Sequence, residues 1–132
     1  MDSGKVSRIF KTPTFPRWMK SIELTDELLS FAVVEMERGL IDADLGGGVI
    51  KKRIALAGRG RSGSSRTLLA TNKNDRWIFI FGFKKNEREN ITIKEPKALK
   101  TVASDLLRYS DEEELNVAVK NCRLEEICHA KN

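Results

Sequence analysis

Apolar residues recur along the chain with two different periods, and the change of period separates predicted helices from predicted strands. In residues 25–38 they recur at spacings of three and four, which predicts an amphipathic helix that Thr25 caps and Gly39 ends. From Val49 onward the period is two, which predicts strands. The predicted elements are a strand over 6–11, helices over 14–20 and 25–38, strands over 49–56, 65–71 and 76–84, and helices over 92–109 and from 110 onward.

The order of these elements predicts an α+β fold with a small, mainly antiparallel sheet. Three consecutive strands joined by loops favour a meander, and we expect the helices to pack on one face of the sheet and to leave the other face free. Residues 42–48 are predicted to form a turn-rich loop, and residues 124–128 fit either a short strand or a tail. The pairs Thr92 with Glu95 and Ser110 with Glu113 have the spacing of helix capping boxes.

The length of 132 residues allows one domain around one core. We expect this domain to span 1–132, with its core over about 6–118 and a C-terminal tail over about 120–132. The longest apolar run, 77–83, is too short to cross a bilayer, and charged residues interrupt the N-terminus where a secretory signal would be apolar. We therefore expect a cytoplasmic protein without membrane contact, in which Cys122 and Cys128 are reduced thiols.

The net charge of +5 is distributed unevenly. Residues 51–88 contain eleven lysines and arginines against two acidic residues, whereas residues 23–50 contain one against seven. A concentration of positive charge on predicted strands is typical of a surface that binds a polyanion, although a solvated basic face has the same composition. The charge distribution therefore favours a nucleic-acid partner.

Strand alternation brings part of this charge together. Lys51 and Arg53 alternate onto one face of the strand over 49–56, and burying two unpaired cations would cost several kcal/mol each, so we expect both to face solvent or a polyanion. In a meander they can converge on one concave surface with Arg66, Lys84 and Lys85. Further RNA contacts are expected from a second set of cations, which are Lys52, Arg59, Arg61, Lys84 and Arg88.

A cluster of this kind can perform two tasks on RNA. It can bind phosphates, and it can stabilise the negative charge that develops when a 2′-hydroxyl attacks the adjacent phosphate. His129 is the one histidine and lies in the predicted tail, which excludes a two-histidine ribonuclease mechanism. Asp42 and Asp44 have no further carboxylates clustered with them in sequence, so we predict neither a metal site nor a cofactor.

Three stretches of the chain resemble the RelE/HigB toxins of type II toxin–antitoxin systems, within the RelE/ParE superfamily. They are DADLGGGVIKKRI (42–54), GSSRTLL (63–69) and IFGFKKNERENI (80–91), with further similarity in FPRW (15–18) and in the helix over 99–107. Together the resemblance covers about residues 6–118. It implies a small sheet with helices, in agreement with the periods of the chain.

The resemblance also implies an activity and its partners. Such toxins inhibit translation by cleaving messenger RNA in the ribosomal A site without metal or cofactor, and an antitoxin, here expected to be a helix-turn-helix DNA-binding protein, neutralises them. By position, Lys51 and Arg53 match the paired basic residues of the second strand, Arg66 matches an arginine of the third, and Lys85 matches the basic residue that closes the next strand. The resemblance thus implies that these four are the candidate catalytic residues. Ile91 stands where RelE has a functional tyrosine, so the general base is unassigned, and Lys51 is the best candidate.

Two alternatives remain at this stage. ParE-type toxins of the same superfamily inhibit gyrase and do not cut RNA, and the dense set of cations favours the nuclease branch. A non-catalytic RNA-binding module would require exposed aromatic residues among the charges. Strand alternation instead places the aromatic residues of the strand over 76–84 on one face, toward the core; they are Trp77, Phe79, Phe81 and Phe83.

Overall fold

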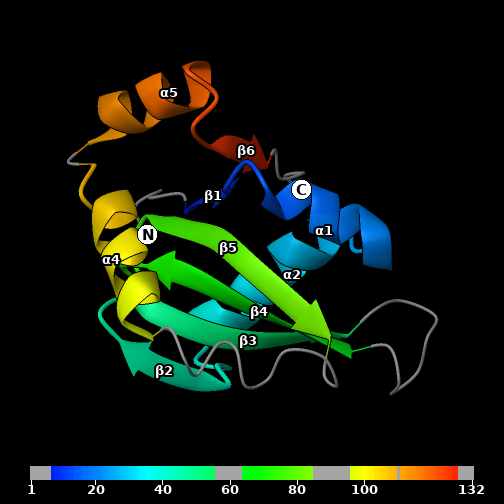
Figure 1. Ribbon diagram of the computed structural model, residues 1–132. Coiled ribbons are helices and arrows are strands. Elements are labelled where there is room, and N and C mark those ends of the chain that lie inside the picture. Colours follow the sequence, from blue (N-terminus) through cyan, green and yellow to red (C-terminus); the bar gives the residue numbers. More distant parts are fainter. Residues whose placement is uncertain (1–6, 56–63, 85–95, 110, 128–132) are drawn as a thin grey trace.

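One mixed sheet of six strands organises the protein, as Figure 1 shows for the computed structural model, which describes residues 7–55, 64–84, 96–109 and 111–127. The strands are β1 (Arg8–Lys11), β2 (Ala43–Gly46), β3 (Val49–Ala55), β4 (Ser64–Thr71), β5 (Arg76–Lys84) and β6 (Glu125–Ile127). Across the sheet they lie in the order β2-β3-β4-β5-β1-β6. β1 is parallel to β5, and the other neighbours are antiparallel. The predicted mainly antiparallel sheet with its β3-β4-β5 meander is confirmed.

Two strands at the edges of the sheet were not assigned from the sequence. β2 lies within the segment that was predicted to be a loop. It could not be recognised as a strand because its four residues are mostly exposed and show no apolar alternation. β6 resolves the ambiguity over 124–128 in favour of a strand, since Ile127 pairs with Ile9 of β1. Leu124 and Ile127 are each 2% exposed, so the predicted tail from residue 120 is wrong: the core continues to residue 127.

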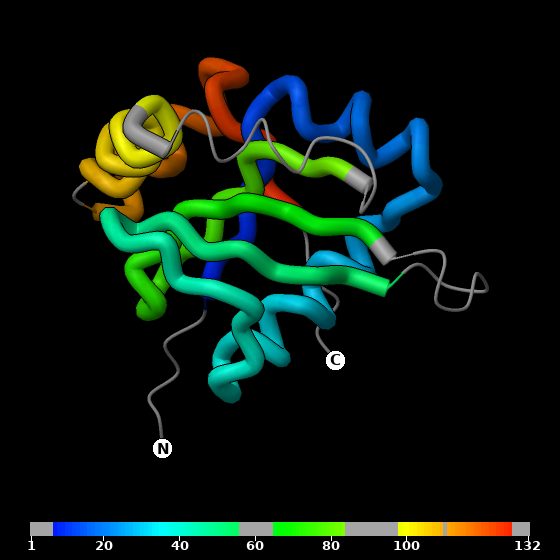
Figure 2. Tube along the Cα trace, turned by 60° about the horizontal axis from the view of Figure 1, so that its bottom comes forward, coloured from blue at the N-terminus to red at the C-terminus, as the bar shows by residue number. Residues whose placement is uncertain are grey.

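In the part of the chain that the structure describes, helices lie on both faces of the sheet (Figures 1 and 2). They are α1 (Phe15–Ile22), α2 (Asp26–Glu37), α4 (Pro96–Leu107) and α5 (Glu112–Lys120). The α+β class is confirmed, but the expectation that all helices pack on one face is wrong. α1 and α2 cover one face, whereas α4 and α5 contribute to a second core on the other. Among the described residues, none of these helices is long and apolar enough to span a membrane.

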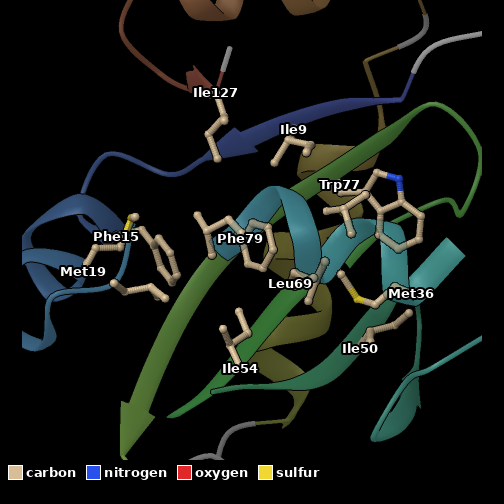
Figure 3. Close-up of a cluster of buried hydrophobic side chains, with 14 of the residues drawn as sticks. Ile9, Phe15, Met19, Met36, Ile50, Ile54, Leu69, Trp77, Phe79 and Ile127 are labelled. Carbon is tan, nitrogen blue, oxygen red and sulfur yellow. The ribbon is translucent and has the colours of Figure 1, made fainter. Parts of the chain in front are cut away.

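The first core lies between the sheet and α1 with α2, and Figure 3 shows it in close-up. The Phe15 ring of α1 stacks on Phe79 of β5 with 5.7 Å between ring centroids. α2 begins as predicted, because the Thr25 side chain accepts a hydrogen bond from the backbone N–H of Leu28. The described buried residues of the first core are Ile9, Phe15, Met19, Ile22, Leu24, Leu29, Ala32, Val33, Met36, Ile50, Ile54, Leu69, Trp77, Phe79 and Ile127.

The second core holds α4 and α5 against the opposite face. Phe10, Val49 and Leu68 of the sheet are buried there with Ala103 of α4. α4 approaches the β2–β3 turn so closely that a Cβ at Gly48 would lie 2.6 Å from a methyl carbon of Leu107. Since α4 packs mainly against β4 and β3, it covers one end of this face and leaves the rest of the face to other contacts.

A β-bulge in β5 reverses which face its later residues occupy. Leu69 of β4 pairs with Phe79 and the preceding Leu68 pairs with Phe81, so Ile80 is an extra residue in β5. Trp77 and Phe79 therefore belong to the first core, while Phe83 belongs to the second, and Phe81 is paired with a residue of the second core. The prediction that the four aromatic residues share one face is wrong, because it assumed uninterrupted alternation.

The cap of α5 also differs from the sequence-based expectation. Asp111 is the N-cap, and its side chain accepts a hydrogen bond from the backbone N–H of Glu114 at 3.0 Å. The predicted box started one residue earlier, at Ser110. Thr92 and Glu95 lie outside the described residues, so the predicted cap of α4 is not tested.

Candidate functional site

Three of the predicted catalytic cations lie on the sheet face that α1 and α2 do not cover. Lys51 and Arg53 of β3 have the opposite orientation to Ile50 and Ile54, which are buried in the first core. Arg66 of β4 is the direct cross-strand partner of Arg53. We call these three residues, Lys51, Arg53 and Arg66, the basic face. Their convergence, predicted from alternation and the meander, is confirmed by the strand register.

The register places two guanidinium-bearing residues directly opposite each other. Like charges at such positions destabilise a sheet, whereas opposite charges would stabilise it. Arg53 forms a long ion pair, with Nε 4.0 Å from the Asp42 Oδ2 atom, and 56% of its side chain is exposed. Arg66 Nη1 is buried and has no hydrogen-bond partner within the described part of the chain. Among the described residues, the pair therefore retains hydrogen-bond donors that no acceptor uses.

Lys52, which we expected to contact RNA, lies on the other face. Its Nζ atom is 2.9 Å from Glu35 Oε1 of α2 and donates a hydrogen bond to the backbone oxygen of Leu40 at 3.0 Å. Only 7% of its side chain is exposed. The expected RNA contact is wrong for this residue, because β-strand alternation directs Lys52 toward α2 with the core residues. Lys52 instead connects the sheet to a helix.

The remaining predicted cations cannot be placed on the basic face. Lys85, Arg88, Arg59 and Arg61 lie outside the described residues, as does Ile91, the position that corresponds to the RelE tyrosine. The backbone of Lys84 pairs with Ser65, and its side chain is not among those described.

One residue on this face was missed from the sequence. Phe81 is 39% exposed and shares a cross-strand row with Leu68 and Lys51, while the neighbouring row contains Phe83, Arg66 and Arg53. The bulge moved Phe81 there, and alternation alone placed it in the core. An exposed aromatic ring therefore does lie among the charges, contrary to the argument used against RNA binding.

The two aspartates considered as metal ligands have other partners. Asp44 Oδ1 accepts a hydrogen bond from the backbone N–H of Gly46 at 3.0 Å, and its Oδ2 atom lies 3.0 Å from Lys73 Nζ. The Gly46 hydrogen bond, followed by the Lys73 contact, holds the pKa of Asp44 below its usual range. Asp42 faces Arg53. Both carboxylates thus belong to the β2–β3 region as structural charges.

A hollow lies between α4 and α5. Acidic side chains line much of it, with two arginines and one aromatic residue, and the set includes Asp105, Arg108, Tyr109, Asp111, Glu113 and Arg123. Its acidic character makes it unsuited to phosphate, in contrast to the basic face.

The fold and the basic face define a class: a small α+β domain whose sheet carries two arginines and a lysine on one face. Comparison with known families is more specific. The family model for the RelE toxin of the RelE/RelB toxin–antitoxin system matches residues 7–127. The chain therefore belongs to the RelE family and is a toxin of a toxin–antitoxin system, which pairs with a cognate antitoxin. No curated protein matches the chain significantly.

Proposed function

We propose that this toxin is an endoribonuclease that cleaves messenger RNA in the ribosomal A site and so inhibits translation. The observation that carries the proposal is the cross-strand pair of Arg53 and Arg66 beside Lys51. A sheet tolerates such a repulsive pair at a cost, and an RNA phosphate on this face would remove the cost by supplying the missing acceptors.

The proposed reaction is an internal transfer at phosphorus. The RNA 2′-oxygen bonds to the adjacent phosphorus while the bond from phosphorus to the 5′-oxygen breaks, leaving a 2′,3′-cyclic phosphate and a 5′-hydroxyl. The proton of the 2′-hydroxyl passes to Lys51, which must enter this step as the neutral amine, and the departing 5′-oxygen takes a proton from water. The hydroxide that this leaves then removes the added proton from Lys51 as water. Arg53 and Arg66 donate hydrogen bonds to the phosphoryl oxygens as their charge increases. The proposal requires neither metal nor cofactor.

The family resemblance extends this assignment beyond the described residues. Lys85 is proposed to stabilise the transition state together with Arg66, and Lys84, Arg88, Arg59 and Arg61 are proposed to bind RNA phosphates. We also propose a helix-turn-helix antitoxin and a cytoplasmic location on the same resemblance. A short neighbouring gene that encodes such a protein would support the antitoxin assignment.

The ribosome enters the proposal through alignment. A site made of cations holds phosphates well, yet it does little to bring a 2′-oxygen into line with the scissile bond. Orientation of this kind is worth up to about 7–11 kcal/mol in well-oriented systems, and a ribosome with a message in its A site could supply it. We therefore expect weak cleavage of free RNA and efficient cleavage of ribosome-bound message.

The test compares these two substrates at equal protein concentration with a metal chelator present. Wild type is measured beside Arg66→Ala and beside Arg17→Ala, a matched control in which an exposed arginine of α1, on the covered side of the sheet, is removed. We expect Arg66→Ala to reduce cleavage on ribosomes by about 100- to 1000-fold, the usual effect of losing one transition-state donor, and Arg17→Ala to cleave like wild type. Equal cleavage by all three would refute the assignment, and no cleavage combined with inhibition of DNA supercoiling would favour the gyrase alternative.

A further inference from the structure

Phe81 is a large apolar side chain in an unusual place. It is 39% exposed on the same sheet face as the three cations, in one cross-strand row with Lys51. Lys51 of β3 and Phe81 of β5 are two strands apart in this row, so about 9–10 Å separates their backbones. Arg66 is the diagonal neighbour of Phe81 on the adjacent strand, at about 7–8 Å. The ring is therefore close enough to contact the same nucleotide as the basic face.

The bulge is what gives Phe81 this position. Without the extra residue at Ile80, alternation would direct Phe81 to the same face as Phe79, which is fully buried in the first core. Bulges recur next to active sites, where they change the direction of a side chain. Here the change turns an aromatic ring out of one core and onto the charged face.

The surroundings hold the ring in a defined place. Phe83, which is 2% exposed, lies beside it with 6.2 Å between ring centroids and a tilt of 35°. Leu68, its partner across the strands, is 1% exposed. Phe81 thus has two buried apolar neighbours, while 39% of its own surface is exposed and available to a ligand.

We propose that Phe81 stacks on the base of the nucleotide whose phosphate contacts Arg66. Every base has a π-face, so such a contact holds single-stranded RNA in place without strong sequence preference. The inference rests on the proposed function, since it needs RNA on the basic face. It adds a base-stacking residue to a site that otherwise recognises only phosphate.

The first test measures binding of an uncleavable, fully 2′-O-methylated RNA oligonucleotide to the intact protein by fluorescence anisotropy at low salt. Phe81→Ala is expected to weaken binding by about 5- to 150-fold, the range found when one aromatic platform is removed. Phe81→Leu should lose most of the affinity, because it keeps apolar area without a π-face, and Phe81→Trp should keep it. Phe31→Ala is the matched control: Phe31 lies on α2 and is 61% exposed, so its loss should leave RNA binding unchanged.

A second measurement separates stacking from a general effect on the fold. The same oligonucleotide is prepared with one abasic nucleotide at each position in turn. At one position wild type should lose affinity while Phe81→Ala loses none, because both changes remove the same contact. If Phe81→Ala fails to fold, Phe81→Leu takes its place in this comparison. Phe81→Trp should lose affinity at the same abasic position as wild type, because it keeps an aromatic ring.

The outcomes distinguish this inference from the function on which it rests. If Arg66→Ala weakens RNA binding but Phe81→Ala and Phe81→Leu bind within twofold of wild type, the stacking proposal fails and the basic face stands. If neither Arg66→Ala nor Phe81→Ala weakens RNA binding, both the stacking proposal and the proposed function fail. Reduced affinity for the antitoxin with unchanged affinity for RNA would overturn the inference and make Phe81 a protein contact.

Discussion

Substitution of Gly82 by alanine should be among the most damaging small changes in this protein. Gly82 lies in β5 beneath the Trp18 indole of α1, and a Cβ added there would be 2.2 Å from the nearest ring carbon. Ordinary van der Waals contact begins at about 3.4 Å, so the ring would have to move by about 1.2 Å. Trp18 packs against the first core, and its ring is tilted by 48° relative to that of Phe15 with 5.4 Å between the ring centroids, so this movement disturbs the contact between α1 and the sheet.

The expected cost follows from this overlap. Forcing extra volume into a packed site typically costs about 1–3 kcal/mol. The entropy of unfolding is about 2.1 cal/mol/K per residue, which gives roughly 0.28 kcal/mol/K for a chain of this length. Gly82→Ala should therefore lower the melting temperature by about 4–11 °C.

A double-mutant cycle, measured by thermal unfolding with circular dichroism, tests the reasoning. Trp18→Ala removes the ring that the new Cβ would meet, so Gly82→Ala should cost much less in that background than in wild type. The coupling free energy should be about as large as the cost of Gly82→Ala alone and of opposite sign. Equal costs in both backgrounds would refute the close approach of Trp18 as the cause.

Three further predictions concern charged residues. Lys52→Met should cleave RNA like wild type and lower the free energy of unfolding by less than the ~3–5 kcal/mol of a buried charge left unpaired, because the Glu35 carboxylate that loses its partner is 34% exposed and stays solvated; loss of cleavage with an intact fold would return Lys52 to the RNA site. Arg66→Gln should keep or raise the melting temperature while reducing cleavage, since it removes a like charge from the cross-strand pair; a marked loss of stability would show that this guanidinium is structural. Asp44→Asn should destabilise the protein at neutral pH but not in strong acid: the hydrogen bond from Gly46 and the contact with Lys73 lower the pKa of Asp44, so their stabilisation is present above the unfolded value of 3.8 and is lost as pH falls through the lower folded value. A pH-independent difference in melting temperature would contradict this account.

Local rules were enough for much of the fold. The spacing of apolar residues and the cap at Thr25 located α2, and period-two alternation in β3 separated Lys51 and Arg53 from the core residues Ile50 and Ile54. The meander followed from three consecutive strands. These features depend on neighbours within a few positions in the chain, so a single sequence contains the information needed to predict them.

Other features depend on partners that are distant in sequence. β6 forms because Ile127 meets Ile9, more than one hundred residues away, and β2 has no apolar pattern by which it could be found. Alternation already grouped Lys52 with the core residues, but only the contact with Glu35 of α2 explains how its charge is accommodated there.

The site divides in the same way. The cations of the basic face could be predicted because each one obeys the alternation of its own strand. Phe81 could not, because the bulge at Ile80 arises from how β5 fits against β4 and leaves no mark in the composition of either strand. The sequence by itself therefore determined which charges share a face. The tertiary structure decided which aromatic ring joins them and which face α4 covers, because strand register and helix docking are set by packing between segments far apart in the chain.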